Sequence, residues 1–326
     1  MPSGERAPWS GSSSGGTYEV LGLVVDSCVP LPNATSTSSA LPDLRVRVEF
    51  AAERPSVSGR VILETGDSTV GGYIATEGPD GFVLTLHGVG SFAFASSLES
   101  VICYPDPACD ADLILPVLLT GMIPAFLMYL RGEVLLHASA VVFDGLTTAI
   151  LGLSGMGKST LAALWCDRGA LLVTDDLLRL DLVQDRPHWV GGSKEIRLRR
   201  NPFTESPDRF AGFPTRLTGD GRMALAFPSV NRASGPLDAV IVPHLDRGAS
   251  AVSIERLTGA AVFNALARYP RLPGWRDPSV LRRQFLVLSE LSSRIPVFHS
   301  VVPWGESYYP EVVDELARAL SDSVLL

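Results

Sequence analysis

Cysteine and runs of positive charge are both scarce in this sequence. The chain of 326 residues has four cysteines and no Cys-x-x-Cys pair, so neither a disulfide scaffold nor an ordinary zinc site is indicated. The few scattered thiols are typical of a protein of the reducing cytoplasm. No run of Lys and Arg occurs, and the formal net charge is -8 with a pI near 5.2. Because phosphate contacts need a basic surface, this composition argues against a nucleic-acid partner.

The sequence also has no uninterrupted hydrophobic run long enough to span a membrane. Residues 1–16 are rich in Ser and Gly and lack the apolar core of a signal peptide, so we expect a disordered leader there. The longest apolar stretch, 113–130, is interrupted by Pro116, Gly121 and Pro124. It therefore predicts a buried helix or a broken pair of helices rather than a membrane span.

The residues that are present divide the chain into two regions. Hydrophobic residues make up 46% of the chain and its mean hydropathy is +0.23, which is enough for a packed core. From 17 to 110, short β-rich runs alternate with turn residues, and 82–86 is expected to pair with 92–95. From 111 to 326, strands alternate with helical patterns, which predicts an α/β domain that begins with the apolar helix.

A glycine-rich loop follows the second of two predicted strands in this α/β region. The strands, in LLHASAVVFDGLTTAILG, are joined at Asp144-Gly145, which is typical of a hairpin turn. A helical pattern and the buried strand LLVTDD follow the loop, and this order is the context that a phosphate-binding GxxxxGK[ST] loop requires. We therefore expect the loop to bind a nucleoside triphosphate, ATP, with Mg²⁺. The predicted nucleotide-binding residues are Gly152, Leu153, Ser154, Gly155, Met156, Gly157, Lys158, Ser159 and Thr160.

Three titratable residues flank the loop in the predicted fold. Asp175 and Asp176 end the strand after the loop's helix, and adjacent strand residues point to opposite faces, so one can hold the metal while the other accepts a proton. Lys158 is expected to reach the β and γ oxygens and Ser159 to ligate magnesium. His137, on the strand before the loop, is either a phosphate-side residue or an ordinary core histidine. If the predicted strand does not form, Asp175 and Asp176 belong instead to a solvated acidic turn.

Four motifs together resemble the C-terminal domain of bacterial HPr kinase/phosphorylase. They are LLHASAVV, GLSGMGKST, RGALLVTDD and the later Lys-Glu-Ile-Arg at 194–197. The resemblance implies a phosphoenolpyruvate-carboxykinase-like P-loop kinase domain, with an N-terminal β-rich domain before it. It implies magnesium ligands Ser159, Asp176 and Glu195, and catalytic roles for the residues His137, Lys158, Asp175, Arg197 and Arg222. In place of the family's Gly-Leu-Gly after Glu-Ile-Arg, this chain has Leu198 to Pro202.

The layout is most similar to HPr-kinase-like serine kinases that modify lasso-peptide precursors. The resemblance thus implies an ATP-dependent serine kinase whose acceptor is a Ser or Thr hydroxyl of a peptide or small protein, in a chain compatible with a homo-oligomer. Two alternatives stay open, a kinase for a small hydroxylated metabolite and a nucleotide-dependent module that binds a partner without transfer. Oxaloacetate decarboxylation is disfavoured, because the carboxykinases' further substrate segments are missing.

The C-terminal third contributes further predicted elements and a set of arginines. We expect strands at 237–245 and 295–301 and helices near 258–268, 278–293 and 309–320. The arginines either line the path of an acidic peptide or form a solvated face. They are Arg268, Arg271, Arg276, Arg282 and Arg283.

Overall fold

The computed structural model describes residues 15–38, 41–50, 55, 58–66, 72–199, 209–305 and 309–324. Most of the predicted leader and the departure at 200–202 lie outside these residues. The chain forms two compact units. Unit 1 comprises 1–19, 23–119 and 274–276, and unit 2 comprises 20–22, 120–273 and 277–326. The division thus falls inside the apolar segment, whereas the sequence placed the domain boundary at 110/111.

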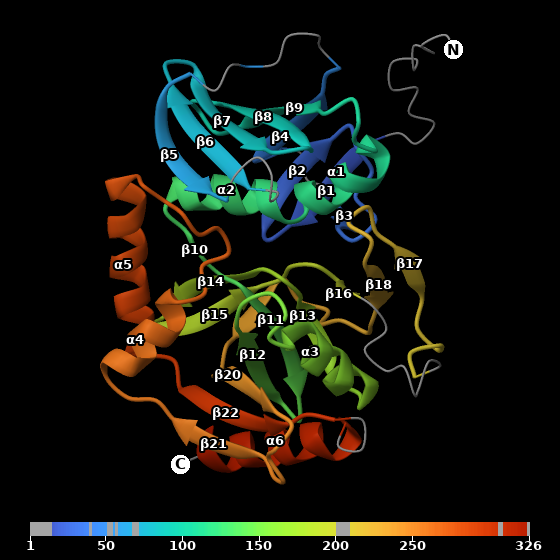
Figure 1. The fold of residues 1–326 in the computed structure, drawn as a ribbon, viewed down its shortest axis with the longest axis vertical. Helices are drawn as coiled ribbons and strands as arrows, with labels where there is room; N and C mark the ends of the chain where they lie inside the picture. The colour runs from blue at the N-terminus through green and yellow to red at the C-terminus, as the bar shows by residue number, and fades with distance from the viewer. Residues whose placement is uncertain are drawn as a thin grey trace. The chain divides into compact units, whose positions relative to one another are not determined.

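Unit 1 is a β-sheet domain whose nine strands lie in the order β3-β1-β2-β4-β9-β8-β7-β6-β5 (Figure 1). β5 to β9 form an antiparallel meander, and the predicted pairing of 82–86 with 92–95 is confirmed, with Phe82 opposite Phe94. In β4, Leu44 and Val46 are buried while Arg45 is exposed, the alternation expected of a sheet with one face on a core. The strands are β1 (Gly16–Val20), β2 (Leu23–Ser27), β3 (Thr35–Ser36), β4 (Leu44–Val48), β5 (Arg60–Thr65), β6 (Tyr73–Gly78), β7 (Gly81–Leu86), β8 (Gly90–Ala95) and β9 (Ser100–Pro105).

The apolar segment folds as two consecutive helices, α1 (Ala111–Leu119) and α2 (Met122–Arg131). This confirms the predicted broken helix pair. Among the described residues, the stretch Ala111–Arg131 is the one helical segment long and apolar enough to cross a membrane by length and composition, and 56% of its most hydrophobic window is buried inside the protein. A core helix passes the same test, so the finding does not by itself indicate a membrane span.

Unit 2 is built on a central sheet of strand order β13-β11-β12-β20-β22-β21. β12, β20 and β22 run parallel, and β11 pairs antiparallel with both β12 and β13. Asp144 and Gly145, both with positive φ (48° and 82°), form the predicted hairpin turn between β11 and β12. The strands of this sheet are β11 (Ala138–Phe143), β12 (Leu146–Leu151), β13 (Leu171–Thr174), β20 (Ala239–Asp246), β21 (Ser253–Arg256) and β22 (Val297–Pro303).

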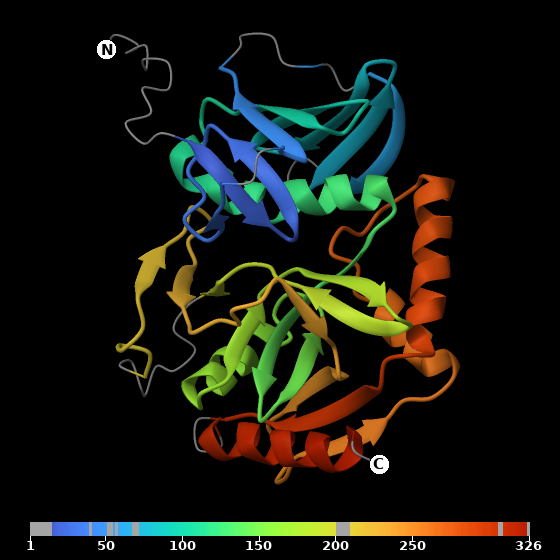
Figure 2. The same cartoon turned by 180° about the vertical axis from the view of Figure 1, so that it is seen from behind.

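Both faces of the central sheet are covered. Along β20, Ile241 belongs to one buried cluster while Val240 and Val242 belong to the other, because successive strand residues point to opposite faces. Figures 1 and 2 show α6 along the edge of the sheet that contains β21 and β22. The first cluster includes residues of α3 (Lys158–Asp167) and α6 (Tyr309–Val324), and the second includes α4 (Ala260–Ala267) and α5 (Pro278–Ser292). The predicted α/β class is confirmed.

Two smaller sheets complete unit 2. Four strands lie in the order β10-β14-β15-β19, and three in the order β16-β18-β17. The sequence did not predict either sheet. Their strands are β10 (Val134–Leu136), β14 (Leu178–Val183), β15 (Arg186–Val190), β16 (Glu195–Leu198), β17 (Thr215–Leu217), β18 (Met223–Ala226) and β19 (Ser234–Pro236). The predicted C-terminal strands and helices are confirmed as β20, β22, α4, α5 and α6, each within a few residues of its expected ends.

Candidate phosphoryl-transfer site

The glycine-rich loop lies between the end of β12 and the start of α3, as its sequence pattern predicts. Gly155 and Gly157 have φ of 91° and 83°, a conformation that residues with a Cβ rarely adopt. Gly157 caps α3, and no side chain caps the helix there. The first N–H groups of α3 are therefore open to an anion, and the helix dipole favours negative charge at this end.

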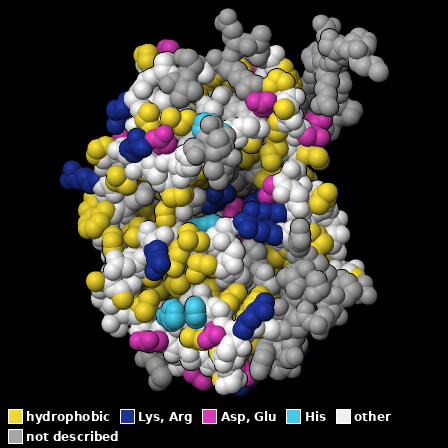
Figure 3. All heavy atoms as spheres, in the orientation of Figure 1, with side chains coloured by type: hydrophobic (Ala, Val, Ile, Leu, Met, Phe, Trp, Pro, Cys, Tyr) yellow, Lys and Arg dark blue, Asp and Glu magenta, His cyan; other side chains and the backbone are white. Residues whose placement is uncertain are grey.

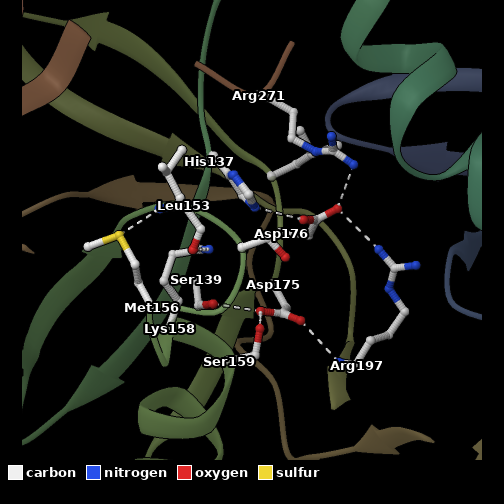
Figure 4. Close-up of polar contacts among 12 residues, drawn as sticks. His137, Ser139, Leu153, Met156, Lys158, Ser159, Asp175, Asp176, Arg197 and Arg271 are labelled. Carbon is white, nitrogen blue, oxygen red and sulfur yellow. Dashed lines mark hydrogen bonds and ion pairs between the residues drawn. The ribbon is translucent and has the colours of Figure 1, made fainter. Parts of the chain in front are cut away.

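The loop packs closely on the neighbouring strand and on itself. A Cβ at Gly157 would come within 2.5 Å of Leu245 Cδ1, at the end of β20, so any other residue here would have to displace the Leu245 side chain as well as adopt an unfavourable φ. The Met156 sulfur accepts a hydrogen bond from the Leu153 N–H at 3.0 Å. Leu153, Ser154 and Gly155 are exposed at the loop tip. The loop thus has a buried base, at Leu151 and Gly152, and an exposed rim. Figure 4 shows Leu153, Met156 and Lys158 of this loop.

Lys158 is buried, with 5% of its surface exposed. Its Nζ donates a hydrogen bond to the Leu153 carbonyl oxygen at 2.9 Å. Burial lowers the pKa of Lys158 to about 8, although Asp175 and Asp176 act in the opposite direction. An ammonium has three donors, and a phosphate oxygen is a stronger acceptor than a carbonyl, so an anion on the loop would draw this side chain toward it.

Asp175 accepts three hydrogen bonds from three elements. Its Oδ1 accepts from the hydroxyls of Ser139 on β11 at 2.6 Å and Ser159 on α3 at 2.8 Å. Its Oδ2 accepts from the backbone N–H of Arg197 on β16 at 3.0 Å. The carboxylate is 4% exposed, so these donors replace the water that burial removes. Asp175 therefore faces the first turn of α3, directly after the glycine-rich loop.

Asp176 faces the other way, toward a histidine and two arginines (Figure 4). Its Oδ1 lies 3.2 Å from His137 Nε2, and its Oδ2 accepts from Arg271 at 2.9 Å and Arg197 at 3.1 Å. Burial alone would raise the pKa of Asp176, but Arg271, His137 and Arg197 together hold it well below its usual value. Its φ of 73° is rare for a residue other than glycine, so this orientation stores backbone strain.

The predicted site histidine is part of this cluster. Burial lowers the pKa of His137, and the hydrogen bond to Asp176 only partly offsets that effect. His137 is thus a neutral imidazole near pH 7 and donates from Nε2 to the Asp176 carboxylate. Figure 3 shows basic, acidic and histidine side chains next to one another on one face of the molecule.

Arg197 and Arg222 meet through a shared acid. Arg197 Nη1 lies 3.3 Å from Asp220 Oδ2, and Arg222 Nε lies 3.1 Å from the same oxygen. Asp220 is in the turn between β17 and β18, where Thr218 donates to its other oxygen. Asp220 therefore links Arg222 to Arg197. Arg197 contacts both site aspartates, Asp175 through its backbone N–H and Asp176 through its guanidinium.

The three predicted magnesium ligands make hydrogen bonds with other residues in the structure. Ser159 contacts Asp175 rather than Asp176, and Glu195 accepts two hydrogen bonds from Arg216, at 2.9 and 2.6 Å. Among the residues that the structure describes, no three His, Cys, Asp or Glu side chains form a group able to hold a metal. Roles for the predicted site residues thus stay predictions.

The structure adds residues to the site that the sequence pattern did not single out. Ser139 follows His137 by two positions, and its place in the His-Ala-Ser motif could have identified it as a site residue. For Arg271 the sequence predicted either a place along an acidic peptide's path or a solvated face. Asp220 and Arg216 carried no motif. The exposed rim also has a contact, since Arg199 donates to the Ser154 hydroxyl at 2.7 Å.

No protein-family model matches the chain, and no curated protein matches it by sequence. Among solved structures, it is similar to the Hpr(Ser) kinase/phosphatase from Coxiella burnetii, with 15% sequence identity and a TM-score of 0.33. The similarity covers 59% of this chain and 99% of that chain. At this TM-score the similarity carries no mechanistic weight, and the chemistry below rests on the contacts of the site itself.

Proposed function

We propose that this protein is an ATP-dependent kinase that transfers the γ-phosphoryl group to a serine or threonine hydroxyl of a peptide or small protein. One observation carries the proposal: the adjacent residues Asp175 and Asp176 diverge, one to the P-loop serine and the other to His137. A module that only binds nucleotide needs the first contact. The second contact, between an ionised carboxylate and a histidine, supports a proton acceptor next to the glycine-rich loop, as transfer to a hydroxyl requires.

The residues present fit Mg²⁺ together with a triphosphate. Magnesium keeps several waters and is usually held by one or two carboxylates plus substrate phosphates, so a cage of protein ligands is not required. Ser159 and Asp175 would hold it, whereas the family resemblance implied Asp176 as the metal ligand and Asp175 as the base. When bound, the ion neutralises charge on the β and γ oxygens.

The chain's own side chains supply the remaining chemistry. The acceptor oxygen forms a bond to the γ phosphorus as the bond to the β–γ bridging oxygen breaks, and ADP leaves. Asp176, oriented by His137, accepts the hydroxyl proton. Lys158, Arg197 and Arg271 stabilise the charge on the transferring group, because each is a cation beside the loop or beside Asp176. Arg222 acts on the same charge more remotely, through Asp220.

The test is transfer of labelled phosphate from ATP to synthetic serine- and threonine-containing peptides. Asp176→Asn should keep nucleotide binding and lower transfer by about 100-fold or more; asparagine tolerates positive φ, so the backbone at this position is preserved. Unchanged transfer in Asp176→Asn would contradict the proposed base. Transfer to small hydroxylated metabolites only would favour the metabolite kinase, and tight binding without any transfer would favour the regulatory module.

The finer proposal for the acceptor is a ribosomally made precursor peptide of the lasso type. It is supported by the sequence resemblance alone, so the peptide panel should include C-terminal segments of such precursors beside unrelated serine peptides of equal length. A preference for the precursor segments, measured as kcat/KM, is the expected result. Equal kcat/KM for both sets would remove the lasso assignment while leaving the kinase proposal intact.

A further inference from the structure

Ser139 is a buried hydroxyl that packing does not explain. It is 0% exposed, on β11 between Ala138 and Ala140, which belong to the apolar cluster on the face of the sheet that α4 and α5 cover. Its own side chain points to the opposite face, toward α3. An alanine would fit such a strand position, and a buried hydroxyl costs free energy unless it is hydrogen-bonded.

The bond that Ser139 makes is to Asp175 Oδ1, at 2.6 Å, the same oxygen that accepts from Ser159 at 2.8 Å. A serine hydroxyl has one hydrogen and two lone pairs. Because Ser159 gives its hydrogen to Asp175, its oxygen keeps only lone pairs to offer, which is the state that a cation requires. The orientation of Ser159 therefore depends on where Oδ1 is held.

We infer that Ser139 is a positioning residue for the magnesium side of the site, acting through Asp175. Together with the Arg197 N–H on Oδ2, it fixes the carboxylate plane so that Oδ1 receives the Ser159 hydrogen. Ser139 touches neither nucleotide nor metal. The inference rests on the proposed function only in that the loop must bind a nucleotide with magnesium; it does not require phosphoryl transfer.

The experiment measures binding of a fluorescent, non-hydrolysable ATP analogue to the full chain as Mg²⁺ is titrated. In Ser139→Ala, the Mg²⁺ concentration that gives half-maximal tight binding should rise about 10-fold or more, the usual loss when a ligand's hydrogen-bond partner is removed. Binding of the analogue without Mg²⁺ should stay within about 2-fold of the unmodified protein, since Ser139 does not face the loop's N–H groups.

Ser300→Ala is the matched control. Ser300 is also 0% exposed and on a strand of the same sheet, β22, but its hydroxyl has no hydrogen-bond partner within the part of the chain that the structure describes. The substitution Ser300→Ala removes the same hydroxyl oxygen as Ser139→Ala from an equally buried position. It should leave the Mg²⁺ dependence of analogue binding unchanged. If Ser139→Ala does not fold, Ser139→Cys serves, since the thiol is a weaker donor and should give an intermediate rise.

Three results would overturn the inference. A Ser139→Ala protein with the Mg²⁺ dependence of Ser300→Ala shows that the hydroxyl does not position the site. Equal losses of binding with and without Mg²⁺ show a general structural role. Absence of analogue binding by the unmodified protein removes the inference together with the proposed function, whereas binding without any transfer to peptides removes only the kinase.

Discussion

Arg271 places a second cation on Asp176 beside Arg197. It is the strongest of the charges that lower the pKa of that carboxyl, and its backbone N–H donates to the Tyr129 hydroxyl at 3.1 Å. In Arg271→Gln we expect the pKa of Asp176 to rise, which makes it a stronger base. Transfer should still fall about 10- to 100-fold, or ~1.4–2.7 kcal/mol, because the cation that stabilises the transferring group is lost. Nucleotide affinity should change little. Steady-state kinetics measure the rate of transfer, and binding of a non-hydrolysable ATP analogue measures nucleotide affinity.

The control for Arg271 is Arg268→Gln. Arg268 is exposed and lies 5.9 Å from the Tyr269 ring, with no contact to either aspartate. Its replacement should leave kcat within about 2-fold, as surface substitutions usually do. Equal kcat values for the two variants would mean that Arg271 is not part of the transfer site.

Gly157 is a second single-residue test, this time of the loop. Gly157→Ala combines a strained φ of 83° with a 2.5 Å approach to the Leu245 side chain, so the loop backbone or Leu245 must shift. We expect the free energy of unfolding to fall by about 1–3 kcal/mol and nucleotide binding to be lost. Gly145→Ala has a similar φ, 82°, with no atom within 4 Å of the added Cβ. It should be destabilised by about 1–2 kcal/mol yet bind nucleotide normally, and nucleotide binding by Gly157→Ala would contradict the loop assignment.

At the scale of elements, Tyr129 joins α2 to β10. Its hydroxyl donates to the Leu135 carbonyl at 3.1 Å, and burial raises its pKa to about 12 from 10.0. A raised pKa means that the folded state favours the neutral phenol. The stabilisation is therefore complete below the unfolded pKa of about 10 and is lost as the pH rises toward 12. Urea unfolding from pH 9 to 12 should show this loss, reduced in Tyr129→Phe.

Buried cysteines titrate in the same range, so the comparison of the two proteins is what isolates the tyrosine. Cys166, for example, has its pKa raised by burial to about 12 in both proteins. The difference in free energy of unfolding between the unmodified protein and Tyr129→Phe should shrink above pH 10. A constant difference across the range would show that the phenol is not held neutral by the fold.

The elements that the sequence predicted are those whose signals are local. Asp144-Gly145 specifies a hairpin, and the loop from Gly152 to Ser159 must lie between a strand and a helix, so this half of the site follows from contiguous residues. Strand periodicity also predicts that Asp175 and Asp176 diverge, and they do, although β13 ends at Thr174 and both aspartates follow it. It cannot say which carboxylate meets Ser159, because that depends on the positive φ of Asp176.

The site residues that no sequence motif predicted belong to elements distant from the loop in the sequence. Arg271 lies 95 positions after Asp176, in the segment that follows α4, where neither neighbour belongs to a motif. Arg216 comes from β17, one of the small sheets without a strong strand signal, and it engages the carboxylate of Glu195. Such pairings depend on tertiary packing, and the spacing of residues along one sequence does not predict them.

At the scale of the whole molecule, every residue of the proposed site belongs to unit 2. A ligand that binds only the folded form stabilises that form by RT ln(1 + [L]/Kd), about 2.7 kcal/mol at 100 times Kd. Unit 2 contains about 200 residues, a size at which 1 kcal/mol corresponds to about 2–4 °C. MgATP at that concentration should therefore raise the unfolding temperature of unit 2 by about 5–10 °C, measured by calorimetry, while the transition of unit 1 moves less.

The two transitions are assigned with one variant in each unit. Phe92→Ala empties a fully buried position on β8 and should destabilise unit 1 by about 3–5 kcal/mol without altering the shift caused by MgATP. Gly157→Ala should instead abolish that shift while leaving the unit 1 transition in place. If MgATP moved the transition that Phe92→Ala lowers, nucleotide would be bound by unit 1, and the glycine loop of unit 2 would not be its site.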